Sequence, residues 1–531
     1  MIGFLMVALL AQPAAQAKPA ATPVSLSEAV AHAAADILNV PQLEQPTVRY
    51  LYFPEPTREN LAAAAFALNT AVSHSSQIVR PLPVAQGRLL RIDLRTLCPR
   101  DTDFERLLKL WEIDLATSDP YFRKPDTFVA ADSGKNFRKV KVAPYRAVNG
   151  KTYDFKSVEI IAADRFALHT GLPNMLLLHS LTGSNAPVLR GDWFTIKCLT
   201  TLDGFYYDLR GFRGRKLADI LTSIGADPQA VANLRSDQRA GLFRSSVTAK
   251  PRQIEVLPIL GVRPTVGPGL LWLTHDPFDA DIDPAFHAMR NLLVLKDRAR
   301  ELIWTNPNGT LSYLLSDAAG NIQDAAPDNV VRDHTIPAPH TNRLQAALSC
   351  IRCHGPNDGL QPFSNDVLAL IQPFEVGGKR VRIDIYDDEA SKTPVFDTVD
   401  RLAGLYTGDL TQTLMQARTS HAKAVYEILG GPLNPKGKSV VVDVSAAVRS
   451  MHDAYEFALV TPEIAVRELG QPGKDFNVVV PLLPANNAGV HTDDPAILAL
   501  RRKIPITRRD WEHAWPDAAT RAATNELQVA P

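Results

Sequence analysis

The chain has 531 residues, with 57 Lys and Arg matched by 57 Asp and Glu, so its formal net charge is zero. Hydrophobic residues make up 45% and charged residues 21%, which is the ordinary mix of a folded globular protein. The charge balance argues against nucleic acid as a partner, because binding to phosphates normally requires a basic excess. The 40 prolines indicate many irregular connections between short elements.

The N-terminus predicts export. Its first ten residues, MIGFLMVALL, form an apolar run that is too short to span a membrane but suits a signal peptide. Ala15-Gln16-Ala17 follows as an A-x-A site, so we expect cleavage after Ala17, which leaves Lys18 first. No Lys or Arg precedes the apolar run, and a buried N-terminal strand or helix is the alternative. No later stretch reaches the ~20 apolar residues of a transmembrane helix. We therefore expect a periplasmic or secreted protein without a transmembrane segment.

The first third of the chain alternates helices with a strand. Apolar periodicity predicts helices over Leu26–Leu38 and over the alanine-rich Arg58–Ser73. A β-type run follows at Arg88–Leu94, and Leu107–Leu115 reads as another helix.

Short strand-like runs dominate the middle of the chain. Asp192–Cys198 and Leu270–Leu273 are two of them, separated from their neighbours by Gly, Pro and Asp. The clearest hairpin unit is Leu311–Leu315, which lies between the turn signals Pro307-Asn308-Gly309 and Asp317-Ala318-Ala319-Gly320. A proline-rich connection, residues 327–339, then leads into a region where helices return.

The motif Cys350-Ile351-Arg352-Cys353-His354 has the spacing C-x-x-C-H. Two thiols three residues apart project from one turn and can add across the two vinyl groups of a haem, while the adjacent imidazole reaches the iron. With four Cys and 13 His in the chain, a chance match is expected on the order of 0.001 times. We therefore expect one covalent haem c on Cys350 and Cys353, with His354 as an axial iron ligand.

Three other uses of the two cysteines are weaker. A structural zinc site would require two more ligands at similar spacing, whereas Cys98 and Cys198 are isolated. A thioredoxin-like site would require a strand before and a helix after the motif, but Pro356 and Gly359 follow almost at once. A disulfide between Cys350 and Cys353 would close a tight, strained loop.

Helices are predicted after the motif, at 399–405, 410–429 and 444–459. A further helix is expected to begin at Thr461-Pro462 and to end at Gly470. The helices at 410–429 and 444–459 hold the downstream candidates for the sixth iron ligand, and two more candidates lie upstream, on or just after the proline-rich connection. The candidates are Met415, His421, Met451, His452, His334 and His340. Met415 is the first choice, although it lies on an apolar stripe and a core position is the alternative. The iron could also be five-coordinate.

Three further signals carry less weight. Leu178-His179-Ser180-Leu181-Thr182-Gly183 lacks the spacing of a hydrolase G-x-S-x-G elbow. The acidic run at 276–283 could bind calcium, but it lacks the Gly and Glu of an EF-hand and a solvated loop is favoured. Cys98 and Cys198 could pair in an oxidising compartment or remain two buried thiols.

The stretch Glu301–Gly355, with its Ile303-Trp304, Pro307-Asn308-Gly309 and Tyr313 pattern, resembles a family of large bacterial extracytoplasmic cytochrome c domain-containing proteins. The resemblance runs from about residue 45 to 470 and departs from the family pattern at Asn357–Leu360. Further segments agree in order: Arg49-Tyr50, Arg91–Arg95, Gly191–Phe194, Trp272–Phe278, Tyr455-Glu456 and Ile464–Gly470. The resemblance implies haem binding at Cys350, Cys353 and His354 and electron transfer, without a known substrate.

These patterns predict an α+β fold, with a mixed α/β N-terminal body followed by a mainly helical, cytochrome c-type haem region. The expected division is a signal peptide at 1–17, a linker and helix at 18–45, an α+β body at 46–340, a haem-bearing helical region at 341–485 and an irregular tail at 486–531, which holds a possible helix at 511–523. We expect one-electron transfer to an unidentified redox partner protein rather than catalysis. The alternative is a haem enzyme, peroxidase-like, or a haem sensor or binding module with an open iron site.

Overall fold

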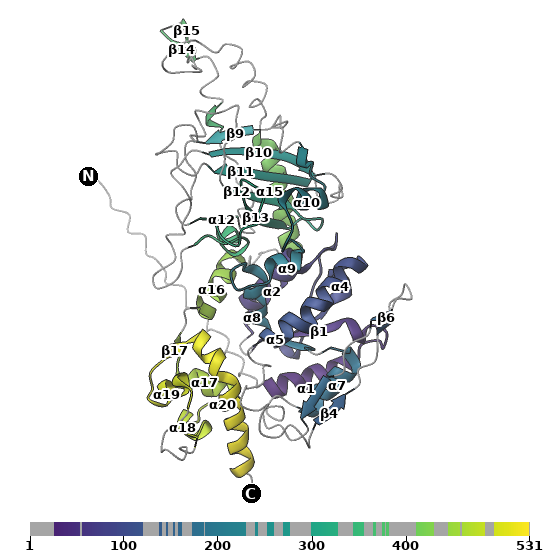
Figure 1. Cartoon of the computed structure of the whole chain (residues 1–531), viewed down its shortest axis with the longest axis vertical. Helices are drawn as coiled ribbons and strands as arrows, with labels where there is room; N and C mark the ends of the chain where they lie inside the picture. Colours follow the sequence, from purple (N-terminus) through teal and green to yellow (C-terminus); the bar gives the residue numbers. More distant parts are fainter. Residues whose placement is uncertain are drawn as a thin grey trace, which may run out of the picture.

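A computed structural model gives the fold of the chain. It describes residues 26–53, 56–119, 137–140, 145–146, 152–153, 158–161, 172–184, 186–229, 239–242, 252–259, 269–276, 299–327, 343–354, 365–367, 374–377, 379–381, 410–429, 444–456, 459–483 and 493–529. The fold belongs to the α+β class, because helices and mixed sheets occur together (Figure 1). The proposed signal peptide lies outside the described residues, as do His334, His340 and the helix expected at 399–405.

A four-stranded sheet organises the N-terminal half. Its strands are β1 (Val48–Tyr52), β2 (Leu82–Val84), β3 (Leu89–Asp93) and β8 (Val188–Arg190), in the order β2-β3-β1-β8. Strand β8 pairs with β1 in parallel and the other pairs are antiparallel. The strand predicted at Arg88–Leu94 is therefore confirmed as β3.

Strand β1 is shared by two hydrophobic cores. Leu51 packs in the main core, whereas its neighbours Tyr50 and Tyr52 pack in the second core. This division follows from the period of two in a strand, which sends successive side chains to opposite faces. The main core continues through the five-stranded sheet and the helices after it, and the second core joins the N-terminal helix to the C-terminal helices.

Helices surround this sheet. They are α1 (Leu26–Ile37), α2 (Arg58–Ala67), α3 (Leu94–Leu97), α4 (Asp101–Lys109), α5 (Ala116–Ser118), α7 (Leu172–Thr182), α8 (Gly191–Leu199), α9 (Tyr206–Arg210) and α10 (Leu217–Ser223), with the short turns η1 (Gln45–Thr47), η2 (Leu68–Val72), η3 (Ala85–Gly87) and η4 (Leu110–Leu115). The helices expected at 26–38, 58–73 and 107–115 are confirmed by α1, by α2 with η2, and by α4 with η4. Two small hairpin-like pairs, β4 (Phe137–Val140) with β7 (Val158–Ile161) and β5 (Tyr145–Arg146) with β6 (Thr152–Tyr153), complete this half.

The segment Asp192–Cys198, expected as a strand, is instead the helix α8. Trp193, Phe194, Ile196 and Cys198 are all at most 2% exposed. Only Asp192 and Lys197 of this helix are partly exposed, so its polar face is small, and such an apolar run cannot be distinguished from a buried strand by periodicity. The strand prediction was therefore wrong.

A five-stranded antiparallel sheet lies beside the C-x-x-C-H motif. Its order is β13 (Leu311–Asp317), β12 (Ala299–Thr305), β11 (Gly269–Asp276), β10 (Arg252–Ile259) and β9 (Arg239–Leu242). The hairpin expected around Leu311–Leu315 is confirmed by β12 and β13, and the strand expected at Leu270–Leu273 by β11. Helix α9 covers the free edge of β13, where the hydroxyls of Tyr206 and Tyr207 accept hydrogen bonds from the backbone N–H groups of Tyr313 and Leu315. This cover satisfies donors that an edge strand would otherwise expose.

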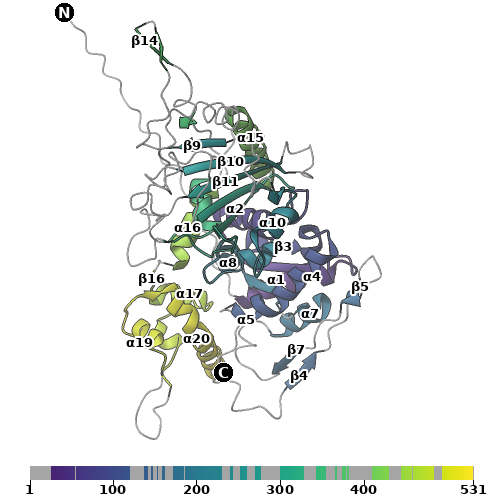
Figure 2. The ribbon, with the colours of Figure 1, turned by 45° about the horizontal axis from the view of Figure 1, so that its top comes forward.

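The motif segment shares the main core with the body. It contains α12 (Leu348–Cys353), the hairpin β14 (Phe374–Val376) with β15 (Lys379–Val381), α15 (Leu410–Ile428) and α16 (Val444–Glu456). Helices α15 and α16 confirm two of the helices expected after the motif. Figures 1 and 2 both show α16 between the five-stranded sheet and the C-terminal helices.

The C-terminal segment forms a helical lobe. Its elements are β16 (Leu459–Val460), α17 (Pro462–Glu468), α18 (Phe476–Val479), α19 (Pro495–Arg501), β17 (Ile506–Thr507) and α20 (Arg508–Val529). Helix α17 is confirmed, with its cap at Thr461. The tail after Ala485 is not irregular as expected, because α19 and α20 bury an apolar stripe that includes Trp511 and Trp515 and continues to Ala522. The possible helix at 511–523 is confirmed as part of α20, and the burial of Trp511 and Trp515 in the second core stabilises it.

Among the described residues, no helix is both long and apolar enough to cross a membrane.

Candidate functional site

The two cysteines of the motif share one short helix. Helix α12 has six residues and carries Cys350 and Cys353, and the amide of His354 donates to the carbonyl of Cys350 at 2.7 Å. Positions three apart on a helix lie on the same side of it, so positions 350 and 353 share one side of α12. The side chain of Cys353 lies outside the described residues.

A strained turn precedes the helix. Ala347 has φ 63° and ψ −76°, and the amide of Leu348 donates to the carbonyl of Ala346 at 3.0 Å. These values are those of a γ-turn with positive φ, which is unfavourable for a residue with a Cβ. Such strain persists where the surroundings dictate it and is concentrated at functional sites. The turn sets the start of the helix directly before the motif.

Cys350 is buried at 2% exposure. Its sulfur lies 3.7 Å from Oε1 of Glu301 on β12. Burial, together with the nearby Cys350, raises the pKa of the tyrosines Tyr206 and Tyr313. The alternative of a disulfide between Cys350 and Cys353 is not tested, because the side chain of Cys353 lies outside the described residues.

His354 is held against one face of the five-stranded sheet. The hydroxyl of Tyr313 donates to the carbonyl of His354 at 3.2 Å, and the ring of Trp272 meets its imidazole edge to face, with centroids 5.7 Å apart. Trp272 pairs with Ile303, which in turn pairs with Tyr313, so the three side chains lie on one face. The imidazole is half-buried, so it can reach a ligand from this platform.

A second imidazole lies near the first. His421 on α15 is 1% exposed, and its Nδ1 lies 3.2 Å from the carbonyl of Gly309, in the turn between β12 and β13. Its Nε2 is buried and has no hydrogen-bond partner in the described part of the chain. Burial lowers the pKa of His421 to about 4; the hydrogen bond to Gly309 opposes this shift and the charge on His354 adds to it. At neutral pH His421 is therefore an uncharged imidazole with one buried nitrogen available.

The other predicted ligands lie less favourably. Met415 is on the same helix as His421, but its side chain is 54% exposed, so neither the first choice of ligand nor the core alternative is supported. Met451 on α16 is 4% exposed and belongs to the main core. His452, which follows it, is equally buried, and its Nδ1 lies 4.0 Å from a carboxylate oxygen of Asp453.

The remaining sequence signals resolve into structural roles where the structure describes them. His179 and Ser180 lie on α7 and bind backbone carbonyls, His179 at Ser184 and Ser180 at Leu177. Asp276 forms an ion pair of 3.1 Å with Arg252, and the rest of the acidic run lies outside the described residues. Cys98 and Cys198 are buried free thiols.

Within the described ranges, no three or more His, Cys, Asp or Glu side chains are grouped so as to hold a metal ion directly. A haem iron requires only two protein ligands, because the macrocycle supplies four.

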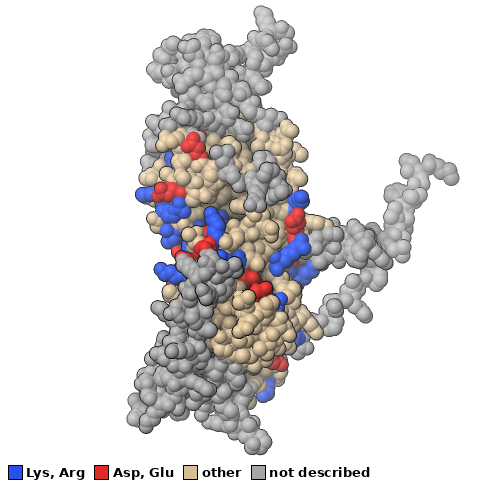
Figure 3. Space-filling model, turned by 90° about the vertical axis from the view of Figure 1, so that its right-hand side faces the viewer, with Lys and Arg blue, Asp and Glu red and all other residues tan. Residues whose placement is uncertain are grey.

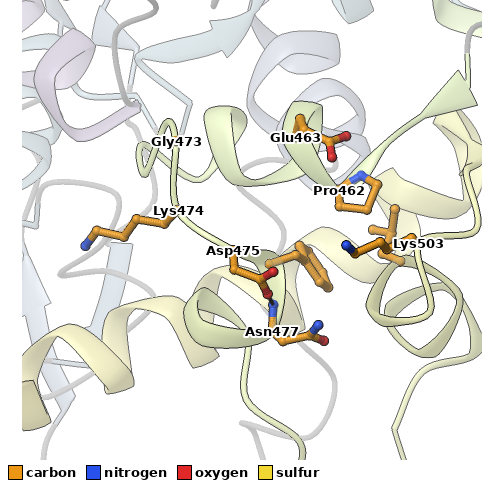
Figure 4. Close-up of a pocket in the computed structure, with 9 residues that line it drawn as sticks. Pro462, Glu463, Gly473, Lys474, Asp475, Asn477 and Lys503 are labelled. Carbon is orange, nitrogen blue, oxygen red and sulfur yellow. Dashed lines mark hydrogen bonds between the residues drawn. The ribbon is translucent and has the colours of Figure 1, made fainter.

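A pocket occurs in the C-terminal lobe, away from the motif (Figure 4). It has a volume of about 250 Å³ and lies between α17, α18 and Lys503. Its carboxylates already have structural roles: Asp475 caps α18 by accepting from the amide of Asn477 at 2.7 Å, and the carboxyl of Glu463 bonds to Thr461 at the start of α17. This pocket therefore offers no set of converging reactive groups.

Charges of both signs are interspersed on the face shown in Figure 3, where blue Lys and Arg lie beside red Asp and Glu. Among the described residues, one group of mixed charges joins Arg213 to Asp208 at 3.6 Å and to Asp324 at 2.5 Å. The described part of this face thus presents a mixed surface, which agrees with the zero net charge.

Several residues around the motif received no role from sequence reasoning, namely Trp272, Glu301 and Tyr313. All three fall in segments that carry the family resemblance, which was the available signal. Comparisons with protein-family models, with curated proteins and with solved structures gave no match.

Proposed function

We propose that the chain is a c-type cytochrome that carries one covalent haem on Cys350 and Cys353 and transfers single electrons. The observation that carries this proposal is the C-x-x-C-H motif, with both cysteine positions on the short helix α12 and His354 directly after it. Its spacing meets the demands of the two vinyl groups and of one axial ligand.

The residues around the motif fit a covalent haem. The buried Nε2 of His421 has no partner among the described residues, and His354 is only half-buried beside Trp272 and Tyr313. A bound haem supplies one-electron chemistry at its iron, with a potential set by the axial ligands and the surrounding dielectric.

The chain's own groups have distinct tasks in this proposal. Cys350 and Cys353 anchor the group, and His354 binds the iron. Trp272 limits the rotation of the His354 ring and excludes water from one side of it, as the edge-to-face contact supports. Tyr313 ties the carbonyl of His354 to β13 and thereby limits movement of the axial ligand.

The proposal includes export, since covalent attachment of haem in bacteria takes place outside the cytoplasm. We propose that the mature chain begins at Lys18 and meets a redox partner protein in the periplasm or outside the cell. N-terminal sequencing of protein from the periplasmic fraction would return Lys18; an intact Met1 on cytoplasmic protein would contradict export.

The test of haem attachment is expression together with a cytochrome c maturation system, followed by a haem stain after denaturing electrophoresis. The wild type should keep its colour, because thioether bonds survive denaturation. Cys350→Ala with Cys353→Ala should abolish the stain. The matched control, Cys98→Ala with Cys198→Ala, removes two buried thiols elsewhere and should keep it. A colourless wild type that binds zinc instead would refute the proposal.

A further inference from the structure

One buried histidine has the geometry of an iron ligand. Helix α15 is amphipathic, and its buried stripe is otherwise apolar: Leu410, Leu414, Ala417, His421, Ala424, Val425 and Ile428. A histidine in this stripe buries two polar nitrogens, which is unfavourable unless both find partners. Only one of them does so among the described residues, at the carbonyl of Gly309.

The partner of Nδ1 determines the state of Nε2. A carbonyl oxygen can only accept, so Nδ1 of His421 must carry the proton that it donates to Gly309. Nε2 then presents a lone pair. Histidines that bind metals very commonly donate their other ring N–H to a backbone carbonyl, which fixes the tautomer and the orientation of the ring. His421 thus has this supporting contact already in place.

The carbonyl that orients His421 is itself held firmly. Gly309 has φ 89°, a conformation that favours glycine, and its amide donates to the carbonyl of Asn306 at 2.9 Å. The neighbouring Asn308 donates to the carbonyl of Asn69 at 2.9 Å, and Arg210 donates to the side chain of Asn306 at 2.9 Å. The turn is therefore tied to η2 and α9, and it offers a fixed acceptor.

His421 and His354 approach each other from different elements. His354 follows α12 on the face of the sheet that carries Trp272 and Tyr313, whereas His421 comes from α15. Both are tied to the hairpin of β12 and β13: Tyr313 on β13 donates to the carbonyl of His354, and Gly309, in the turn before β13, accepts from His421. Two imidazoles from separate elements can bind an iron from its two sides.

We infer that Nε2 of His421 is the sixth ligand of the iron, so that the imidazoles of His354 and His421 hold it from opposite faces. The inference rests on the proposed function and deepens it. The lone pair of Nε2 forms the iron bond while the proton stays on Nδ1, so binding releases no proton. An iron with both axial positions filled has no open site for peroxide, which favours an electron carrier over a peroxidase or a gas sensor.

The experiment compares holoprotein variants by optical and electron paramagnetic resonance spectra in both oxidation states. The wild type should be six-coordinate and low spin, without the charge-transfer band of a methionine ligand. His421→Ala should become high spin and bind carbon monoxide when reduced, and added imidazole should restore the low-spin spectrum. His452→Ala, the other buried histidine after the motif, and Met415→Ala on the exposed side of α15 are the controls and should keep the wild-type spectrum.

A second variant guards against a folding defect. His421→Met keeps a long side chain in the same position, and it should give a low-spin iron with a higher reduction potential, because a thioether replaces an imidazole. A wild type that is high spin, or a His421→Ala holoprotein with an unchanged spectrum, would overturn the assignment of His421. In both cases a haem stain that survives denaturation leaves the proposed function intact, whereas loss of covalent haem from the wild type refutes the proposed function itself.

Discussion

Two buried polar clusters lie in the two cores of the molecule, and they differ in one respect. In the C-terminal lobe, Glu468 accepts from Nη1 of Arg508 at 2.7 and 2.8 Å, from Nε1 of Trp511 at 2.9 Å and from Arg190 at 3.4 Å. Burial acts to raise the pKa of Glu468, but the charges of Arg508 and Arg190 outweigh it and hold that pKa below its usual value. Both oxygens of the carboxylate are satisfied.

The cluster beside the five-stranded sheet is incomplete. His421 satisfies Nδ1 at Gly309, while Nε2 finds no partner within the described chain. A buried polar atom without a partner lowers stability by about 1–3 kcal/mol. The closed cluster is therefore expected to stabilise the fold, whereas the open one is expected to bind a ligand. Variants of the two clusters should separate these roles.

The largest effect on stability is expected at Glu468. Glu468→Gln removes the charge that faces the buried Arg190 and Arg508, and loss of one partner of a buried ion pair typically lowers the free energy of unfolding by about 3–5 kcal/mol. Urea unfolding would measure the change. Glu44→Gln, at an exposed position, is the control and should unfold like the wild type. If both variants unfold alike, the closed cluster does not stabilise the lobe.

Asp119, which contacts Arg190 of the same cluster, should make the stability of the protein depend on pH. It is fully buried, and burial raises its pKa to about 7, although its hydrogen bond from the amide of Arg190 and the charge of Arg190 oppose the shift. Because this acid has a higher pKa when folded than when unfolded, the folded state is penalised as the pH rises from about 4 through 7. The full shift corresponds to about 4 kcal/mol as an upper bound.

Asp119→Asn should remove this penalty, since the amide oxygen can still accept from Arg190. The wild type should lose stability between pH 5 and pH 8 relative to the variant, as measured by urea unfolding at each pH. The two should converge at low pH, where the aspartate is protonated in both states. Parallel curves across this range would contradict the raised pKa of Asp119.

The smallest effect is expected in the open cluster. Tyr313→Phe removes the hydroxyl that donates to the carbonyl of His354, and it should lower the free energy of unfolding by about 1 kcal/mol. Tyr426→Phe, at a 43% exposed position on α15, is the control. Thermal unfolding of the chain without haem would compare them. A loss at Tyr313 as large as that at Glu468 would mean that the open cluster also has a mainly structural role.

Local sequence patterns predicted many of the helices and strands, because turn signals and motif spacing depend only on residues that are close together in the chain. The hairpin of β12 and β13 follows from Pro307-Asn308-Gly309, and the motif at Cys350 is recognised by spacing alone. The helix α8 could not be recognised, because the burial of most of its residues leaves little of the polar face that marks an amphipathic helix. Its packing against α2 and the four-stranded sheet stabilises the helical conformation.

The comparison of Met415 with His421 shows what helical periodicity can and cannot predict about an iron ligand. Both residues lie on α15, six positions apart, and therefore on different faces of the helix. The buried stripe through Leu414 and Ala417 includes His421 and excludes Met415, so the placement of Met415 on the apolar stripe was wrong. What the pattern could not provide was the contact with Gly309, which lies 112 positions earlier in the chain.

The central claim is the covalent attachment of haem to the motif, and mass spectrometry of the proteolytic fragments around it tests this most directly. Wild-type chain would be produced in cells that carry a cytochrome c maturation system and that also mature a control cytochrome. The account predicts one haem per chain, bonded through thioethers to both Cys350 and Cys353. Unmodified cysteines at both positions, in cells where the control cytochrome is fully matured, would contradict it.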